Sequence, residues 1–84
     1  LMTNLYGSLE AGGTKFICAV ADEDFNTVEE LQFPTTTPKE TLKKTADFFA
    51  KFKNLKAIGI KENTTALVFL SHYSSFFLYL FFFQ

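Results

Sequence analysis

Residues 7–15 read Gly-Ser-Leu-Glu-Ala-Gly-Gly-Thr-Lys and lie between two apolar runs of the chain. Gly12 and Gly13 carry no Cβ atoms that would keep a ligand away from the main chain, so successive N–H groups can converge on an anion. Thr14 adds a hydroxyl donor at the same place. The stretch therefore predicts a strand, a glycine turn suited to phosphate, and a second strand.

A carboxylate precedes the two glycines by two residues. Glu10 alone would repel a phosphate group at the turn, because like charges raise the energy of the bound state. A divalent cation between the two removes that repulsion, and Mg²⁺ with its waters commonly joins carboxylates to phosphates. We therefore expect the Glu10 carboxylate to face the metal ion and not to act as a general base.

Two better-known glycine motifs are excluded. From Gly7 the sequence approaches the P-loop pattern G-x-x-x-x-G-K-[ST], but Gly13 stands where the lysine is required. No helix is expected next, because residues 16–21 are a short, continuous apolar run that is typical of a buried strand. The dinucleotide pattern G-x-G-x-x-G is absent. The spacing leaves two interpretations open, a turn that faces a nucleotide and an ordinary glycine hairpin.

The rest of the pattern predicts a mixed α/β fold. Apolar runs predict strands at 4–10, 14–21, 27–33 and 55–60. The first three follow one another through short turns and should form an antiparallel meander. The fourth is reached through a helix and is expected to run parallel to its neighbour. The predicted order is βββαβ.

The helix, predicted at 38–53, has a well-marked start. Thr37 is the expected N-cap, a proline takes the first helical position, and Glu40 completes a capping box. Apolar side chains recur on one face and charged ones on the other, which we interpret as a solvated face. Asp47 and Lys51 are expected to pair as neighbours one turn apart.

Residues 5–16, Leu-Tyr-Gly-Ser-Leu-Glu-Ala-Gly-Gly-Thr-Lys-Phe, resemble the opening of bacterial fructokinases in the ROK group of sugar kinases, within the actin- and hexokinase-like ATPases. Most ROK members have Asp at the Glu10 position, and Glu-Ala-Gly-Gly-Thr-Lys is similar to the fructokinase branch. The resemblance continues through 18–20 and 32–38 and fades after Ile60. It implies that residues 1–60 are part of an actin-like ATPase lobe, which is ribonuclease H-like.

The resemblance also implies an activity and its ligands. A complete family member would transfer the γ-phosphate of ATP to the 6-hydroxyl of fructose, and such enzymes are often homodimers. The residues implied to contact ATP are Glu10, Gly12, Gly13, Thr14 and Lys15, with Glu10 also implied to face Mg²⁺. The family's catalytic aspartate, hexose-binding residues and zinc ligands lie downstream of the matched stretch. No catalytic residue and no zinc ligand is therefore assigned.

Residues 61–84 differ from the family pattern. They hold half of the chain's 12 phenylalanines and lack helical or strand periodicity. We interpret them as a non-family hydrophobic tail, produced by a frameshift or otherwise unrelated, and prone to aggregation. His72 is the chain's single histidine and is expected to be a tail residue, since zinc needs further ligands nearby.

Composition restricts the remaining functions. The 84 residues carry a net charge of −1, which gives no basic face for nucleic acid. Cys18 is the one cysteine, so no intrachain disulfide forms, and its apolar strand indicates a small buried hydrophobe. No secretion signal is recognisable, and we expect a cytoplasmic location without a membrane partner.

Two classes of function stay open. The first is a fragment of an ATP-dependent fructokinase that is inactive as these 84 residues alone, because the general base and sugar site are missing. The alternative is a non-enzymatic fragment of a ROK-type regulator, or a small membrane-associated peptide. A ROK repressor would carry a helix-turn-helix ahead of the glycine motif, and six residues precede Gly7 here. We therefore favour the enzyme fragment.

Overall fold

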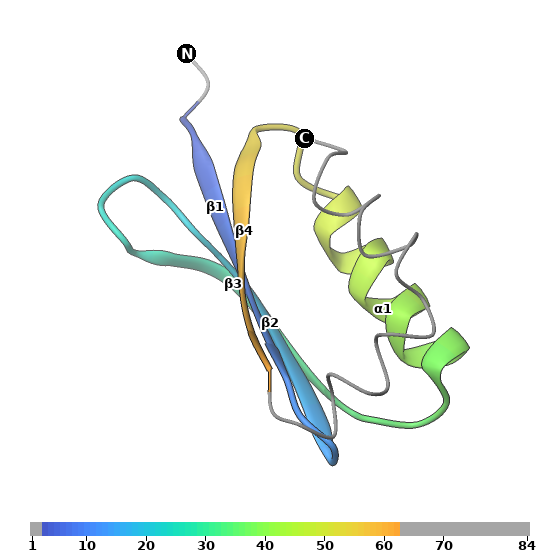
Figure 1. The fold of residues 1–84 in the computed structure, drawn as a ribbon. Helices are drawn as coiled ribbons and strands as arrows, with labels where there is room; N and C mark the ends of the chain where they lie inside the picture. The colour runs from blue at the N-terminus through green and yellow to red at the C-terminus, as the bar shows by residue number, and fades with distance from the viewer. Residues whose placement is uncertain (1–2, 63–84) are drawn as a thin grey trace.

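The computed structural model of the protein describes residues 3–62. Its five elements are β1 (Leu5–Ala11), β2 (Lys15–Ala21), β3 (Thr27–Pro34), α1 (Pro38–Ala50) and β4 (Leu55–Glu62). The predicted order βββαβ is confirmed, and the strands form one sheet with α1 lying along one face (Figure 1).

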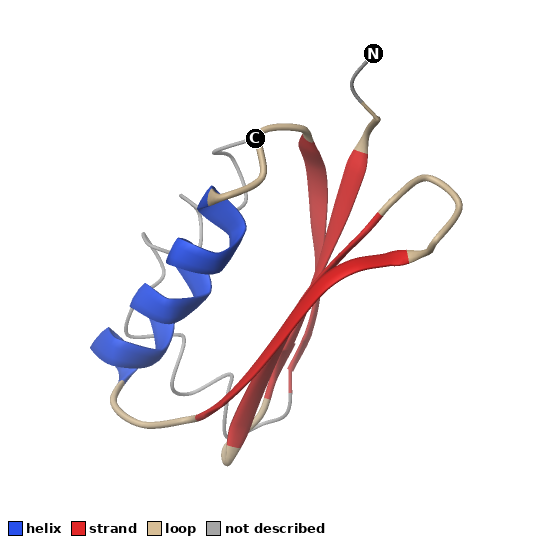
Figure 2. Cartoon of the chain, turned by 180° about the vertical axis from the view of Figure 1, so that it is seen from behind, coloured by secondary structure: helices blue, strands red, loops and turns tan. Residues whose placement is uncertain are grey.

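The sheet has the strand order β3-β2-β1-β4. β2 pairs antiparallel with both β1 and β3, as the meander predicted. β4 runs parallel to β1 and completes the sheet on the other side, so β3 and β4 are the edge strands among residues 3–62 (Figure 2). The parallel pairing of β4 confirms the expectation for a strand reached through a helix.

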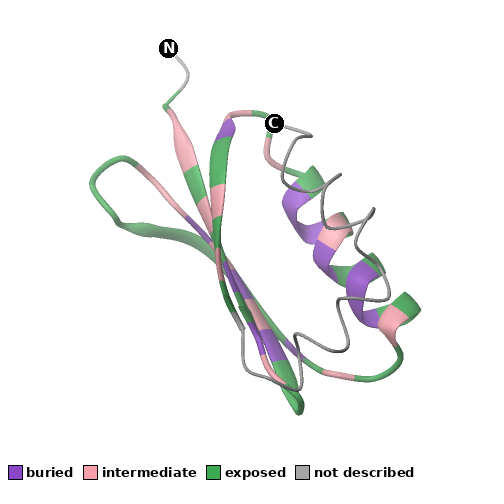
Figure 3. Ribbon diagram, viewed as in Figure 1, coloured by how far each residue is buried: buried purple, intermediate pink, exposed green. Residues whose placement is uncertain are grey.

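The core lies between α1 and the sheet face that it covers. Alternate residues of β1 and β2 point to this face because side chains of a strand alternate sides, and the colours along these strands in Figure 3 alternate between buried and less buried residues. The buried apolar residues are Leu9, Ala11, Phe16, Cys18, Val20, Phe33, Leu42, Phe48, Phe49 and Leu55. The opposite face of the sheet has no covering element within residues 3–62 (Figure 2).

The start of α1 follows its sequence signal. The Thr37 hydroxyl accepts a hydrogen bond from the Glu40 N–H at 3.2 Å and donates one to Glu40 Oε1 at 3.0 Å. The bond from the Glu40 N–H is the N-cap half of the predicted capping box, and the Glu40 carboxylate is held at the cap by the Thr37 hydroxyl. The hydrogen bond from Thr37 lowers the pKa of the Glu40 carboxyl below its ordinary value. The helix therefore begins where the sequence places it.

The end of α1 and one ion pair differ from the prediction. The helix ends at Ala50 and not at 53, because Lys51 N–H turns back to the Phe48 carbonyl, a tighter bond that closes the last turn. The expected pair of Asp47 with Lys51 is wrong. Asp47 instead accepts from Lys43 at 2.8 Å, and Lys51 pairs with Glu29 of β3.

The pairing of Lys51 with Glu29 has a geometric reason. Its ammonium lies 4.8 Å from the ring centre of Phe48, on the side of α1 that faces the sheet. Glu29 is the register partner of Val20, whose side chain is buried under α1. Glu29 of β3 therefore lies close enough to pair with Lys51. Spacing within the helix could not reveal a partner on a strand.

Residues 63–84 lie outside the part of the chain that the structure describes. The predictions about the tail, its origin, its aggregation and His72 fall there and stay predictions. Strand β4 does continue to Glu62, two residues beyond the predicted strand end, so Lys61 belongs to the sheet. Within residues 3–62, no helix has the length and apolar character needed to cross a membrane.

Candidate functional site

The glycine turn connects β1 to β2 as predicted. The Gly12 N–H donates to the Lys15 carbonyl at 3.0 Å and closes a tight hairpin. Gly12 and Gly13 both lie outside positive φ, as does every glycine among residues 3–62. The backbone conformation therefore does not require glycine here, and the missing Cβ atoms leave the main chain of the turn approachable.

Thr35, in the connection between β3 and α1, holds this turn from the side. Its hydroxyl donates to the Gly12 carbonyl at 2.8 Å, and its N–H donates to the Thr14 carbonyl at 2.9 Å. Two acceptors of the turn are thus occupied by the protein. No pattern in the sequence indicates this support, because the partners of Thr35 are distant in the chain: Gly12 lies 23 positions away.

Two N–H groups of the turn, unlike the carbonyls of Gly12 and Thr14, have no partner in the described part of the chain. The N–H groups of Gly13 and Thr14 have no hydrogen-bond partner among residues 3–62, and both residues are exposed. With the Gly12 and Thr14 carbonyls occupied and the Gly13 and Thr14 N–H groups free, the turn presents hydrogen-bond donors with partial positive charge to solvent. This arrangement can bind an anion through the main chain.

The turn lies at the end of the sheet where ligands of α/β proteins commonly bind. β1 and β4 are parallel, and both end near the turn, where α1 also begins (Figure 1). In open α/β sheets, ligands lie beyond the carboxyl ends of the parallel strands. At the start of α1, the Glu40 N–H is already bonded to the Thr37 side chain. The free main-chain donors described above therefore belong to the glycine turn and not to this N–H.

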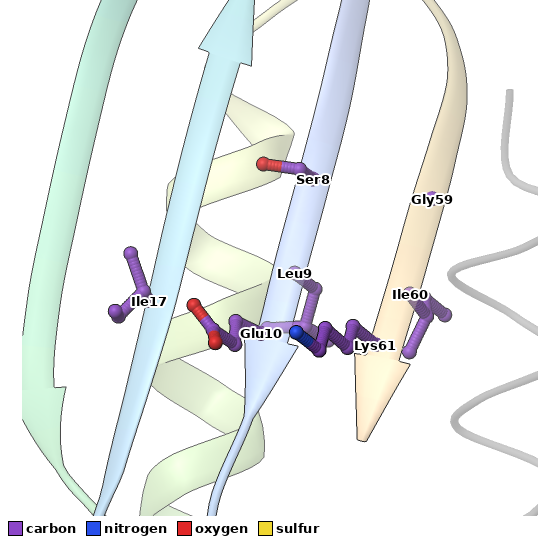
Figure 4. Close-up of a pocket in the computed structure, with 7 residues that line it drawn as sticks. All are labelled: Ser8, Leu9, Glu10, Ile17, Gly59, Ile60 and Lys61. Atoms are coloured by element: carbon purple, nitrogen blue, oxygen red, sulfur yellow. The ribbon is translucent and has the colours of Figure 1, made fainter.

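Glu10 lies on the sheet face opposite α1, near the end of β1, and is exposed. It lines a shallow hollow of about 380 Å³ on that face (Figure 4). The described lining residues are Ser8, Leu9, Glu10, Ile17, Gly59, Ile60 and Lys61. The structure therefore brings Glu10 together with polar groups of β1 and β4.

The other predicted site residues do not line the hollow. Gly12, Gly13 and Thr14 form the adjoining turn, and Lys15 begins β2 on the strand side shared with Ile17 and Glu10. Lys15 pairs in register with Pro34 and is exposed. The predicted set is thus split between a turn and a hollow that are joined through β1.

The donor chemistry fits magnesium better than zinc. Residues 3–62 contain no group of three or more His, Cys, Asp or Glu side chains that could hold a metal ion. Mg²⁺ keeps most of its waters and is usually held by one or two carboxylates together with substrate phosphates. A single exposed carboxylate near the end of the strand that leads into the glycine turn fits that mode of binding, whereas zinc needs several protein ligands.

Cys18 is not part of this site. The residue is fully buried against the helix, as predicted. Burial raises the pKa of its thiol from 9.0 to about 11, although a hydrogen bond with Thr45 opposes part of the rise. A thiol that stays protonated is a poor nucleophile, so Cys18 is a packing residue.

These features define a class of protein. A βββαβ unit with a glycine turn between its first two strands is consistent with a partial actin-like ATPase lobe. The chain matches the ROK family over residues 6–68, and it belongs to that family.

Named relatives agree with this assignment. A fructokinase of Streptococcus mutans serotype c is 65% identical over 60 residues, which are 70% of this chain and 20% of that protein. A fructokinase of Lactococcus lactis subsp. cremoris is 52% identical over 59 residues, which are again 70% of this chain and 20% of that protein. A fructokinase of Zymomonas mobilis subsp. mobilis is 49% identical over 47 residues, or 56% of this chain and 16% of the relative. The chain thus spans about a fifth of the length of the first two relatives.

Proposed function

We propose that residues 3–62 form the nucleotide-phosphate-binding part of an ATP-dependent fructokinase. The observation that carries this proposal is the hydrogen bonding of the glycine turn, where Thr35 occupies the carbonyls of Gly12 and Thr14 and the N–H groups of Gly13 and Thr14 stay free. An ordinary hairpin needs no such support from a third segment. The names of the relatives supply fructose as the sugar.

The chain's residues would act by binding and orientation. The N–H groups of Gly13 and Thr14 would hold phosphate oxygens, the Thr14 hydroxyl would add a donor, and Lys15 would add positive charge. Mg²⁺, when bound with the nucleotide, neutralises charge on the phosphates that react. Glu10 would hold the waters of that ion. Phosphoryl transfer depends mainly on such positioning and charge neutralisation.

The 84 residues by themselves are proposed to bind the nucleotide weakly and not to turn it over. One phosphate-binding turn covers little of a ligand that normally lies within a deep cleft. We assign no general base for the sugar hydroxyl within residues 3–62. Measurable phosphorylation of fructose by this chain, above a blank without protein, would contradict this part of the proposal.

The binding part is tested with the full 84-residue chain and Mg²⁺-ATP. We expect Gly13→Ala to weaken binding about tenfold, because an added methyl group obstructs hydrogen bonds to a charged ligand that are each worth about 1.5–3 kcal/mol. The φ of Gly13 tolerates alanine, so the fold should persist. Asn26→Ala, in the hairpin turn between β2 and β3, is the matched control and should bind as the unaltered chain does.

Calorimetric titration at several Mg²⁺ concentrations measures the affinity, and circular dichroism checks the fold of each variant. Equal affinities of the unaltered chain and Gly13→Ala would refute the role of the turn. The regulator and membrane-peptide alternatives have no specific observation in their favour, since the relatives described above carry the name fructokinase.

A further inference from the structure

Lys61 is a positively charged side chain in the hollow that contains Glu10. The two residues are register partners across the parallel pair of β1 and β4, so their side chains lie on the same face of the sheet. Both line the hollow, and Figure 4 shows the Lys61 side chain extending from β4 toward β1, whereas the Glu10 carboxylate points to the other side of β1, toward Ile17. The sequence pattern had placed Lys61 in the tail.

The ammonium of Lys61 is not consumed by a structural ion pair. The ion pairs found within residues 3–62 are Lys43 with Asp47 and Lys51 with Glu29. Lys61 is exposed and forms neither a hydrogen bond nor a ring contact with any described residue. Its charge is therefore available to a ligand in the hollow.

The glycine turn lacks the lysine that a P-loop provides. In the P-loop pattern a lysine follows the last glycine and contacts the phosphates, but Gly13 occupies that place here. Lys61 stands near the carboxyl end of β4, at the end of the sheet where the turn lies. A lysine ammonium on a flexible stem is an effective point charge for phosphate.

We propose that Lys61 is a phosphate-binding residue of this site and contacts a polyphosphate chain whose other end lies on the glycine turn. The inference rests on the proposed nucleotide-binding function and adds a residue to it. In this arrangement Lys61 supplies positive charge beside Glu10 even without a divalent cation. The chain should thus retain part of its affinity for polyphosphate when Mg²⁺ is removed.

The shape of the hollow supports the same use. Gly59 lies opposite Ser8 in the parallel register, and a Cβ atom built at Gly59 meets no other atom within 4 Å. The floor of the hollow is therefore open at this point. A large side chain at position 59 would occupy the space without removing any charge, and it offers a second way to block the ligand.

The test uses the full 84-residue chain, tripolyphosphate as the probe, and chelator in place of Mg²⁺ at low ionic strength. We expect Lys61→Ala to weaken binding about fivefold, the effect of losing one exposed charge contact of up to about 1 kcal/mol. Lys61→Arg should retain the affinity, and Gly59→Leu should lower it. The matched control is Lys56→Ala, an exposed lysine at the other end of the same strand, which should change affinity less than about twofold because salt and distance screen its charge.

Each outcome separates this inference from the proposed function. If the unaltered chain binds tripolyphosphate and Lys61→Ala binds it equally well, Lys61 is not a ligand-binding residue, while the role of the turn is unaffected. If Lys61→Ala and Lys56→Ala weaken binding by the same factor, the effect is general charge and the inference is wrong. If the unaltered chain binds neither tripolyphosphate nor Mg²⁺-ATP, the proposed function itself fails.

Discussion

At the residue scale, Cys18 shows how burial changes chemistry. The thiol lies in the core between β2 and α1, and its pKa rises from 9.0 to about 11 because burial disfavours the thiolate. The folded state therefore holds the thiol proton more tightly than the unfolded state does. The stabilising contribution is complete below pH 9 and is lost as the pH rises toward 11.

A pH titration of stability tests this expectation. Between pH 8.5 and 11 the unaltered chain should lose up to about 3 kcal/mol more stability than Cys18→Ala, which has no thiol to ionise. All other ionisable groups are common to both chains, so their contributions cancel in the difference. Urea denaturation followed by circular dichroism gives the midpoints. Parallel pH profiles of the two chains would show that the thiolate is not excluded from the core.

At the scale of elements, the contact between α1 and β1 depends on a residue without a side chain. A Cβ atom at Gly7 would lie 2.9 Å from Phe49 Cε1 and 3.1 Å from Ile58 Cγ1. Both distances are shorter than ordinary carbon contacts, which lie at about 3.5–4.0 Å. Gly7 therefore lets the aromatic face of α1 settle onto the sheet, a role that its place in the glycine-containing motif did not indicate.

We predict that Gly7→Ala destabilises the fold by about 1–3 kcal/mol, the usual cost of overpacking a core. Gly59→Ala is the matched control, because its added methyl group enters open space on a neighbouring strand. The urea midpoint should fall for the first variant and stay within error, or rise slightly, for the second. A Gly7→Ala chain as stable as the control would mean that α1 can shift away without cost.

At the scale of the whole molecule, the described fold has one covered face and two open edges. Residues 3–62 place α1 over one side of the sheet only, with Val28 of β3 52% exposed and Tyr6 of β1 40% exposed. Unpaired strand edges and exposed apolar side chains favour association between copies of a chain. We therefore expect self-association that rises with concentration.

A charge placed on an edge strand should reduce this association. Val28→Lys puts a positive charge on β3, and strand edges bearing lysine pair poorly with other strands. Ala50→Lys makes the same change in net charge at the exposed end of α1 and serves as the control. Sedimentation velocity should show fewer oligomers for the first variant than for the second. Equal distributions would indicate that association, if present, proceeds through another part of the chain.

The local features of this protein could be predicted from its sequence. The start of α1 at Thr37, the order βββαβ and the turn at Gly12 and Gly13 depend on neighbours within a few positions, such as the hydrogen bonds of a capping box. The burial of Cys18 followed from its continuous apolar strand. These features are encoded by short-range geometry, which a sequence pattern displays directly.

Other features were decided by the tertiary structure alone. Thr35 supports the glycine turn, Lys51 pairs with Glu29, and Lys61 stands opposite Glu10 in the strand register, and each pair is separated by more than 20 positions in the chain. The register of β1 with β4 places Lys61 opposite Glu10, the pairing of β2 with β3 brings Thr35 to the turn, and the packing of α1 on the sheet brings Lys51 to Glu29. Spacing within one element does not show which residue of a distant strand or helix lies opposite it. The sequence therefore determined the elements and the glycine turn. Packing determined which charges and hydroxyl groups lie next to that turn and in the hollow.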